Sequence, residues 1–324
     1  MVLMSFKRLL PALLAPALLT ACGAAGGEAD TASPHVVAAF YPLEWASTQV
    51  LGDHGSVTTL TAPGAEAHDL ELTPRQIASL AEADLVVYLK GFQPAVDDAI
   101  EQSGADHAFD VGGVVDLLSA EDGHSHDHGE EGGDDSDAEE EHAEDDGHDH
   151  GDFDPHFWQD PERMQVLVTA LGDRLAASDP DNSADYASNA ATTVEKLARL
   201  DGEFQAGLAQ CERPEFMTTH AAFGYLADRY NLTEIGVSGV NPDDEPSPAR
   251  IAEIHKEAQV HGLTTVFFET LTSNSVAEAI AGDLGLETAV LDPLEGITEK
   301  SPGDDYPSIM RANLEALRVA NGCS

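Results

Sequence analysis

The sequence predicts an α/β protein built from two similar lobes that are joined by one long helix. Short apolar runs alternate with helix-like segments in both halves of the 324-residue chain, which is typical of mainly parallel strands linked by crossover helices. Between the halves, a polar-rich segment from about Ser183 to Gln210 contains no strong turn signal and is expected to form a single bridging helix. Two such lobes leave a cleft between them, which is the usual place for a small ligand.

The first half contains four expected strands and the helices between them. The apolar runs that predict strands are Val36–Tyr41, Val57–Ala62, Leu85–Leu89 and Ala108–Val111. The segments with helical spacing are Leu43–Leu51, Pro74–Ala83, Pro94–Gln102 and, further along the chain, Pro161–Ala177. The polar, proline-containing stretch Ser178–Asn182 is expected to end the last of these before the bridging helix begins.

The second half repeats the alternation. Its expected strands are Glu215–Thr219, Thr233–Val237, Thr265–Phe268 and Thr288–Leu291. Its expected helices are Ala222–Tyr230, Pro248–Val260, Val276–Leu284 and Asp305–Ala320. The pattern places the N-terminal lobe at residues 34–178, the bridging helix at 179–211 and the C-terminal lobe at 212–324.

The first residues predict export. Lys7 and Arg8 precede an apolar run that is too short and too proline-broken to span a bilayer permanently. The sequence Leu19-Thr20-Ala21-Cys22 is typical of a bacterial lipobox, which predicts a signal peptide at 1–21 and a lipid on Cys22. Residues 22–33 are small and flexible, as a tether would be. We therefore expect a lipoprotein anchored to the outer face of the cell membrane, with an ordinary secretory signal as the alternative.

Two further cysteines, Cys211 and Cys323, remain in the exported chain. Because exported proteins fold in an oxidising compartment, an even pair is expected to be bridged. The sequence therefore predicts a disulfide between the start of the C-terminal half and the end of the chain.

The charge of the chain points to a cation. The formal net charge is -45, with only 15 Lys and Arg residues, so there is no basic face to bind nucleic acid. The insert Glu121–Asp152 contains no Lys or Arg and few apolar residues, and it is too polar to fold alone. Imidazoles and carboxylates attract divalent cations, so its histidines are candidate low-affinity metal ligands; they are His124, His126, His128, His142, His148 and His150. A solubilising acidic linker is the alternative interpretation.

A tighter site is expected at the cleft. His68, His156 and His220 each follow an expected strand or the insert, and Asp292 ends the strand Thr288–Leu291. Since ligands bind beyond the carboxyl ends of strands in open α/β sheets, these four side chains are expected to converge. Three imidazoles and one carboxylate make a tetrahedral zinc set.

Glu269 ends another strand of the C-terminal half. Ligating histidines usually donate their other ring N–H to a carboxylate, and Glu269 is a candidate for that role. A helix-capping or solvated acid is the alternative. Phe157 and Trp158 are expected to shield the site from water.

Four segments together resemble a known family. They are Pro63–Pro74, Asp154–Trp158, Thr219–Tyr225 and Leu291–Leu294, and they are similar to the metal-site motifs of the zinc-binding solute receptors of ATP-driven metal uptake transporters. The resemblance covers essentially the mature chain, including the lipobox and the long helix. It implies two four-stranded lobes hinged on a rather rigid helix, with Zn²⁺ held between them as the transported ligand and delivered to a membrane permease.

The resemblance also bears on the metal and on the fourth ligand. Manganese and iron receptors of similar appearance have a carboxylate at the position of His220, and a third imidazole favours zinc. Some relatives use water or a glutamate next to the first histidine. Here that neighbour is Ala67 and the glutamate is Glu66, so the fourth ligand stays open between Asp292, water and Glu66.

The expected function is a monomeric zinc receptor and not an enzyme. Metal binding needs neutral imidazoles, so the affinity is expected to fall as the pH drops through about 6.5. The alternatives are a manganese or iron receptor of the same type, a metallohydrolase with an open coordination position, and an extracellular zinc buffer or adhesin. No His-Glu-x-x-His motif supports the hydrolase.

Overall fold

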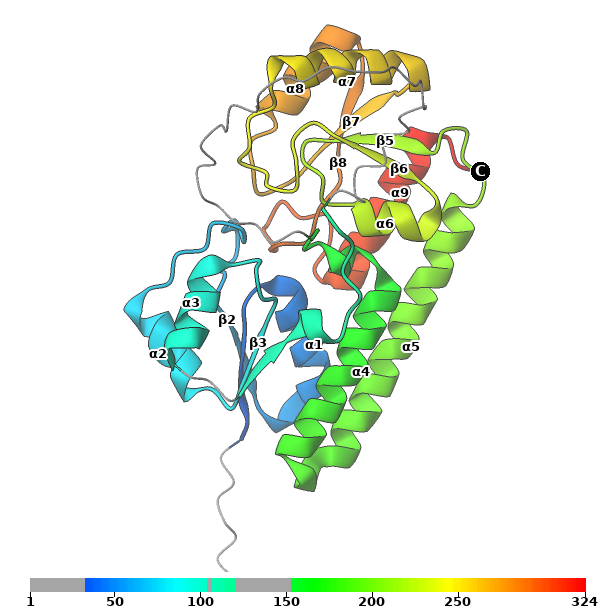
Figure 1. Cartoon of the computed structure of the whole chain (residues 1–324). Helices are drawn as coiled ribbons and strands as arrows, with labels where there is room; N and C mark the ends of the chain where they lie inside the picture. Colours follow the sequence, from blue (N-terminus) through cyan, green and yellow to red (C-terminus); the bar gives the residue numbers. More distant parts are fainter. Residues whose placement is uncertain (1–32, 104–106, 121–152) are drawn as a thin grey trace, which may run out of the picture. The chain divides into compact units, whose positions relative to one another are not determined.

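The computed structural model describes residues 33–103, 107–120 and 153–324, and Figure 1 shows how its elements are arranged. The predicted signal peptide, Cys22 and the six histidines of the insert lie outside these residues. Within the described residues, no helix combines the length and apolarity that a bilayer crossing requires.

The first half forms a four-stranded parallel sheet in the order β2-β1-β3-β4. Its strands are β1 (His35–Ala38), β2 (Ser56–Thr59), β3 (Leu85–Tyr88) and β4 (Ala108–Asp110), and its helices are α1 (Tyr41–Leu51), α2 (Pro74–Glu82) and α3 (Pro94–Ser103). Strand β1 is shorter than predicted because α1 begins at Tyr41, where Pro42 occupies the first turn of the helix. Thr73 and Gln76 form a capping box that starts α2.

The second half forms another four-stranded parallel sheet, in the order β6-β5-β7-β8. Its strands are β5 (Glu215–Thr218), β6 (Thr233–Gly236), β7 (Thr265–Phe268) and β8 (Glu287–Val290), and its helices are α6 (Gly224–Tyr230), α7 (Pro248–His261), α8 (Ser275–Leu284) and α9 (Tyr306–Asn321). The order matches that of the first sheet, strand for strand. The predicted fold class is confirmed.

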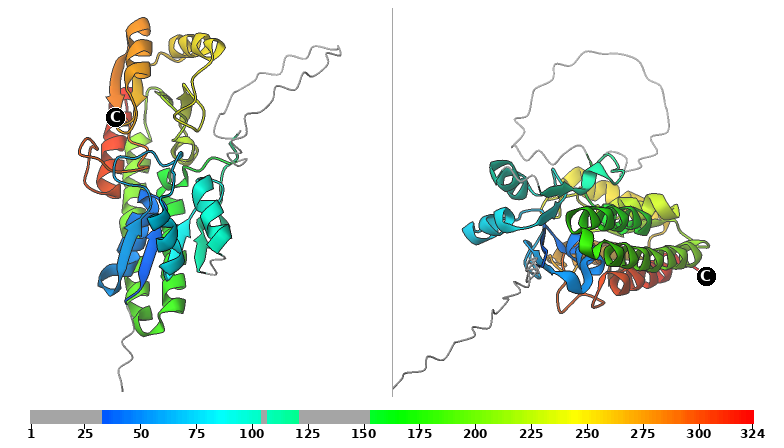
Figure 2. Two further views of the ribbon diagram at one scale, coloured as in Figure 1. Left: turned by 90° about the vertical axis from the view of Figure 1, so that its left-hand side faces the viewer. Right: turned by 90° about the horizontal axis from the view of Figure 1, so that it is seen from below.

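Two long helices, α4 (Pro161–Ser178) and α5 (Ser183–Leu208), lie side by side and form a helical hairpin (Figures 1 and 2). They approach closely where Gly172 faces α5, since a Cβ added there would lie 2.8 Å from the Cβ of Ala190. Helix α5 contacts α1 of the first half and α9 of the second. The sequence predicts α5 as the bridge and α4 as part of the N-terminal lobe. In the structure, α4 packs lengthwise against α5.

In the described part of the chain, the remaining elements are four short 3₁₀ helices: η1 (Gly52–His54), η2 (Val111–Gly113), η3 (Phe157–Gln159) and η4 (Pro180–Asn182). The largest cluster of buried apolar side chains includes the first sheet, the α4–α5 hairpin and α9. A smaller cluster fills the space between the second sheet and helices α7 and α8. The predicted disulfide between Cys211 and Cys323 is present, and it links the chain after α5 to the chain after α9.

Candidate metal centre

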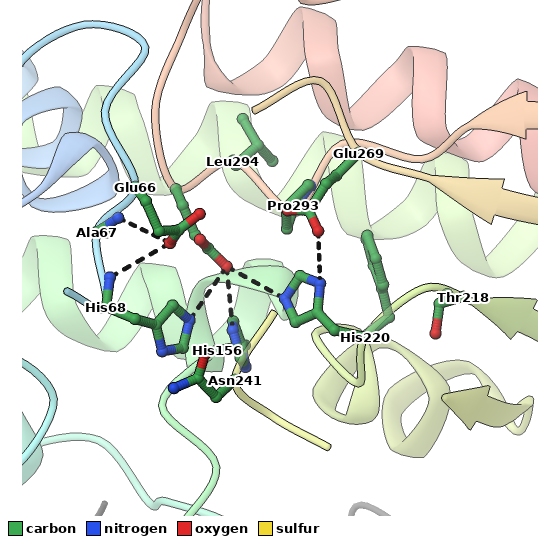
Figure 3. A network of polar contacts seen from close by, with 12 residues as sticks. Glu66, Ala67, His68, His156, Thr218, His220, Asn241, Glu269, Pro293 and Leu294 are labelled. Atoms are coloured by element: carbon green, nitrogen blue, oxygen red, sulfur yellow. Dashed lines mark hydrogen bonds and ion pairs between the residues drawn. The ribbon is translucent and has the colours of Figure 1, made fainter. Parts of the chain in front are cut away.

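Three histidines and one glutamate converge at the carboxyl ends of the two sheets. They are His68, His156, His220 and Glu295, and their candidate ligand atoms all lie within 4.8 Å of one another. His68 follows β2, His220 follows β5, Glu295 follows β8, and His156 directly precedes η3. All four side chains are buried, with 3% or less of their surface exposed. Figure 3 shows the three imidazole rings pointing toward one another.

The Nε2 atoms of the three imidazoles face one carboxylate oxygen. Glu295 Oε1 lies 3.2 Å from Nε2 of His156, 3.4 Å from Nε2 of His220 and 3.5 Å from Nε2 of His68. The Nε2 atoms of His68 and His220 are buried and have no hydrogen-bond partner of acceptable geometry among the described residues. Buried nitrogens without such a partner are unusual unless a ligand completes them. The donor set fits a tetrahedral zinc ion.

Carboxylates fix the other nitrogen of two of the rings. His156 Nδ1 lies 2.7 Å from Asp154 Oδ1, and His220 Nδ1 lies 2.9 Å from Glu269 Oε1. An N–H on Nδ1 donates to each carboxylate, which orients the ring and leaves Nε2 to face the centre. Glu269 therefore lies beside one of the three histidines. Asp154 was not singled out, although its place two residues before His156 is a signal for such a contact.

The electrostatics of the site couple the imidazoles to the acids. Burial alone would lower the pKa of His156, but Asp154 and Glu295 outweigh it and raise that pKa to about 9. Burial likewise opposes the charged form of His220, yet Glu269 and Glu295 raise its pKa well above the usual value. Burial lowers the pKa of His68, against the attraction of Glu295. Burial would raise the pKa of Glu295, but His68, His156 and His220 hold it well below the usual range.

Glu66 lies beside Glu295 and outside the four-residue cluster. Its Oε1 accepts hydrogen bonds from the backbone N–H groups of Ala67 at 2.8 Å and His68 at 3.3 Å, as Figure 3 shows. Burial, together with the neighbouring charge of Glu295, raises its pKa to about 9. Glu66 therefore holds the peptide that carries the first histidine.

Asp292, the carboxylate placed with the three histidines from the sequence, is not brought to the imidazoles in the structure. Its Oδ1 accepts from the backbone N–H of Leu294 at 2.9 Å, and its Oδ2 accepts from Thr270 Oγ1 at 3.1 Å. The carboxylate that faces the cluster is Glu295, three residues later. Glu295 was not predicted from the sequence, because Asp292 is the first acid after β8 and both residues are acids. The turn that carries Glu295 inward depends on a left-handed backbone at Leu294, with φ of 65°, which leucine rarely adopts.

Aromatic side chains lie against two of the three histidine rings. The ring of Phe92 lies 4.8 Å from that of His68, and Trp158 lies 5.2 Å from His156. Trp158 stands where the sequence predicted a shield against water, whereas Phe157 packs against Trp158 at 5.7 Å. Phe92 was not predicted to contribute. Apolar walls lower the local dielectric and strengthen the interaction between a cation and its ligands.

Comparison with known proteins identifies similar chains. The family described as "Zinc-uptake complex component A periplasmic" matches residues 36–320. The zinc-binding protein AdcA of Streptococcus pyogenes is 38% identical over 287 residues, which cover 88% of this chain and 55% of AdcA; the chain thus spans about half the length of that relative. The high-affinity zinc uptake system protein ZnuA of Bacillus subtilis is 36% identical over 314 residues, or 93% of each chain. The crystal structure of the Zn(II)-bound ZnuA-like domain of Streptococcus pneumoniae AdcA matches with a TM-score of 0.71 and 31% identity, over 89% of this chain and 99% of that domain.

Proposed function

The chain belongs to the family of the periplasmic zinc-uptake complex component A, and from this membership we propose that it is an exported receptor for Zn²⁺. It captures the ion between its lobes outside the cell and delivers it to the permease of an ATP-driven uptake transporter. The observation that carries this proposal is the convergence of three buried imidazoles and one carboxylate on a single point. The zinc-binding names of the relatives support the same cargo.

The ligand types favour zinc over manganese or iron. Imidazole nitrogen suits zinc, whereas manganese prefers sites rich in carboxylate and water oxygen. His220 supplies the third nitrogen ligand, so Glu295 is the one residue of the cluster that offers an oxygen ligand. We propose His68, His156, His220 and Glu295 as the ligands, in place of a set that includes Asp292.

The chain's own residues prepare this site for a cation. Asp154 and Glu269 hold the Nδ1 sides of two imidazoles, so that Nε2 is the atom left for the metal. Glu295 supplies a negative charge that partly balances the dication. Because the imidazoles bind only when neutral, zinc must displace the protons that the acids stabilise on His156 and His220.

The same geometry favours a receptor over a hydrolase. A catalytic zinc site keeps a coordination position open for water, and four protein ligands fill all positions of a tetrahedral ion. The lipobox at Leu19-Thr20-Ala21-Cys22 supports anchoring of the receptor to the outer face of the membrane through a lipid on Cys22. We propose that it works there as a monomer.

Native mass spectrometry with zinc and with manganese tests the proposal. The wild type should retain one tightly bound zinc ion, and the triple variant His68→Ala, His156→Ala, His220→Ala should lose it. A matched control replaces three histidines that are not part of the metal cluster. They are His35, which bonds Thr58, His107, which bonds a backbone carbonyl, and His261, which pairs with Glu215. This control should keep the tight ion. Retention of that ion by the first triple variant would refute the ligand set.

A further inference from the structure

We propose that Trp158 and Gln159 are positioning residues for Glu295 and that they set the preference of the site for zinc over harder cations. The inference rests on the proposed function, because it concerns the selectivity of the same site. The two halves of the chain are in contact near the metal cluster. Trp158 and Gln159 belong to η3, which directly follows His156, whereas Glu295 belongs to the loop after β8.

Both side chains donate to one carbonyl group of the Glu295 loop. Trp158 Nε1 donates to the carbonyl oxygen of Pro293 at 2.7 Å, and Gln159 Nε2 donates to the same oxygen at 2.5 Å. Both donors are fully buried, so water does not compete for these hydrogen bonds. Tyr306 Oη in turn donates to the carbonyl oxygen of Trp158 at 2.6 Å. The short helix η3, which directly follows His156, therefore holds the turn that carries Glu295.

The turn before Glu295 is also fixed by residues of the second half of the chain. The Asn313 side chain makes two hydrogen bonds with the backbone of Asp292: its Oδ1 accepts from the N–H at 2.9 Å, and its Nδ2 donates to the carbonyl at 2.7 Å. Asp292 Oδ1 accepts from the N–H of Leu294. Leu294 adopts a left-handed backbone with φ of 65°, which persists for a leucine only where the surroundings impose it. The backbone just before Glu295 is thus held by hydrogen bonds from both halves of the chain.

This constraint limits how the carboxylate of Glu295 can meet a cation. Oε1 of Glu295 faces the three Nε2 atoms, while Oε2 is buried without a hydrogen-bond partner among the described residues. One oxygen and three nitrogens suit a four-coordinate zinc ion. Manganese, magnesium and calcium favour six or more ligands, mostly oxygen, and gain when a carboxylate turns to offer both of its oxygens. A turn that fixes the backbone just before Glu295 restricts such a rotation of its carboxylate.

The test uses two variants that remove one donor each and one matched control. Trp158→Phe removes the indole N–H and keeps an aromatic ring. Gln159→Met removes the amide and keeps the length of the side chain. Gln165→Met is the control, since Gln165 on α4 also donates to a backbone carbonyl, that of Pro161 at 3.2 Å, and is not part of the metal cluster. Zinc and manganese dissociation constants are measured by competition with a chelating dye, and the visible absorption of bound Co²⁺ reports the coordination number.

We expect both variants to lower the ratio of the manganese to the zinc dissociation constant by about tenfold, since removal of a group that holds a metal ligand changes metal affinity by roughly 10–100-fold and the change should fall mainly on zinc. The Co²⁺ absorption should weaken as the coordination number rises. Gln165→Met should leave the ratio and the spectrum unchanged. Equal weakening of both metals with an unchanged Co²⁺ spectrum would refute a role in selectivity and leave only a structural role. A wild-type protein that binds no zinc would refute the proposed function as well, whereas a zinc-binding wild type with an unchanged ratio in the variants would refute this inference alone.

Discussion

At the scale of single residues, the proposed zinc site depends on which atoms of a few side chains face one point. The convergence of His68 and His220 could be predicted from the sequence because parallel sheets bring the carboxyl ends of their strands together, and His156 could be added because it follows the insert. The carboxylate could not, because Asp292 and Glu295 are both acids just past β8. Their roles are separated by the left-handed backbone of Leu294, a conformation that nothing in the identity of a leucine announces.

The first prediction compares these two acids. Glu295→Gln should weaken zinc binding by more than about 100-fold, since it removes the charge of a proposed ligand, whereas Asp292→Asn should fall within the roughly 10–100-fold range of groups that hold ligands. Chelator competition at one pH measures both. A larger loss in Asp292→Asn than in Glu295→Gln would return Asp292 to the ligand set and remove Glu295 from it.

The second prediction concerns pH. The raised pKa values of His156, to about 9, and of His220 mean that the metal-free protein carries protons on these imidazoles at pH 7. Zinc displaces them, so its affinity should rise as the pH increases from about 6.5 toward 9, by about one decade per pH unit for each proton released. His68 does not contribute in this range, since its pKa is lowered, and Glu295 stays charged.

The structure thus moves the pH-sensitive range above the value of about 6.5 that free histidine suggests. Titration calorimetry in buffers of different ionisation enthalpy counts the protons released at pH 7. An affinity that is flat between pH 7 and 9, with no buffer-dependent enthalpy, would show that the imidazoles are already neutral at pH 7.

At the scale of elements, the alternation of strands and helices made the fold predictable, and the helix pairing was harder to foresee. Pro74, Pro94, Pro161 and Pro248 begin helices in the structure, as the preference of proline for the first turn predicts. The packing of α4 along α5 depends on the close approach at Gly172, which periodicity within one helix does not reveal.

Helix α6 connects the site to the peptides on both sides of residues 121–152. Tyr225 Oη accepts from the N–H of Leu118 at 2.8 Å and donates to the carbonyl of Asp154 at 2.6 Å. Asp154 N–H donates to the carbonyl of Leu118 at 3.0 Å, and Ser119 pairs with Phe153 as an antiparallel bridge. The Tyr225 hydroxyl therefore holds the backbone of Asp154, and the side chain of Asp154 orients His156.

The third prediction tests this connection. Tyr225→Phe leaves the half-buried N–H of Leu118 and the buried carbonyl of Asp154 with one partner fewer, which should lower the free energy of unfolding by about 1–3 kcal/mol. It should also weaken zinc binding, because Asp154 is held less firmly. Tyr230→Phe is the matched control on the same helix, where the hydroxyl donates to Asp201 at 3.1 Å. Denaturant unfolding and chelator competition give the two quantities, and equal zinc affinity in both variants would separate Tyr225 from the site.

At the scale of the whole molecule, two groups of histidines are distinguished by their surroundings. The cluster at the sheet ends is buried and held by carboxylates. The six histidines of the insert lie in a segment with sixteen acidic residues and no Lys or Arg, which predicts weaker, diffuse attraction of cations. The sequence leaves three roles open for the insert: concentrating zinc, sensing its excess, or passing it to the buried site.

The fourth prediction separates the two groups. Deletion of residues 121–152 should leave one tight zinc ion and remove several weaker ones, since none of the proposed ligands lies in the deleted segment. Calorimetric titration of the intact and deleted proteins gives the number of each class. Loss of the tight ion on deletion would mean that the insert is part of the high-affinity site.

The most direct test of the central claim is a crystal structure of the zinc-loaded protein with the metal located by its anomalous scattering. We predict one fully occupied zinc ion at about 2.0–2.2 Å from Nε2 of His68, His156 and His220 and from a carboxylate oxygen of Glu295. A zinc ion bound by Asp292 with Glu295 turned away, or no ordered zinc among these histidines, would contradict the account.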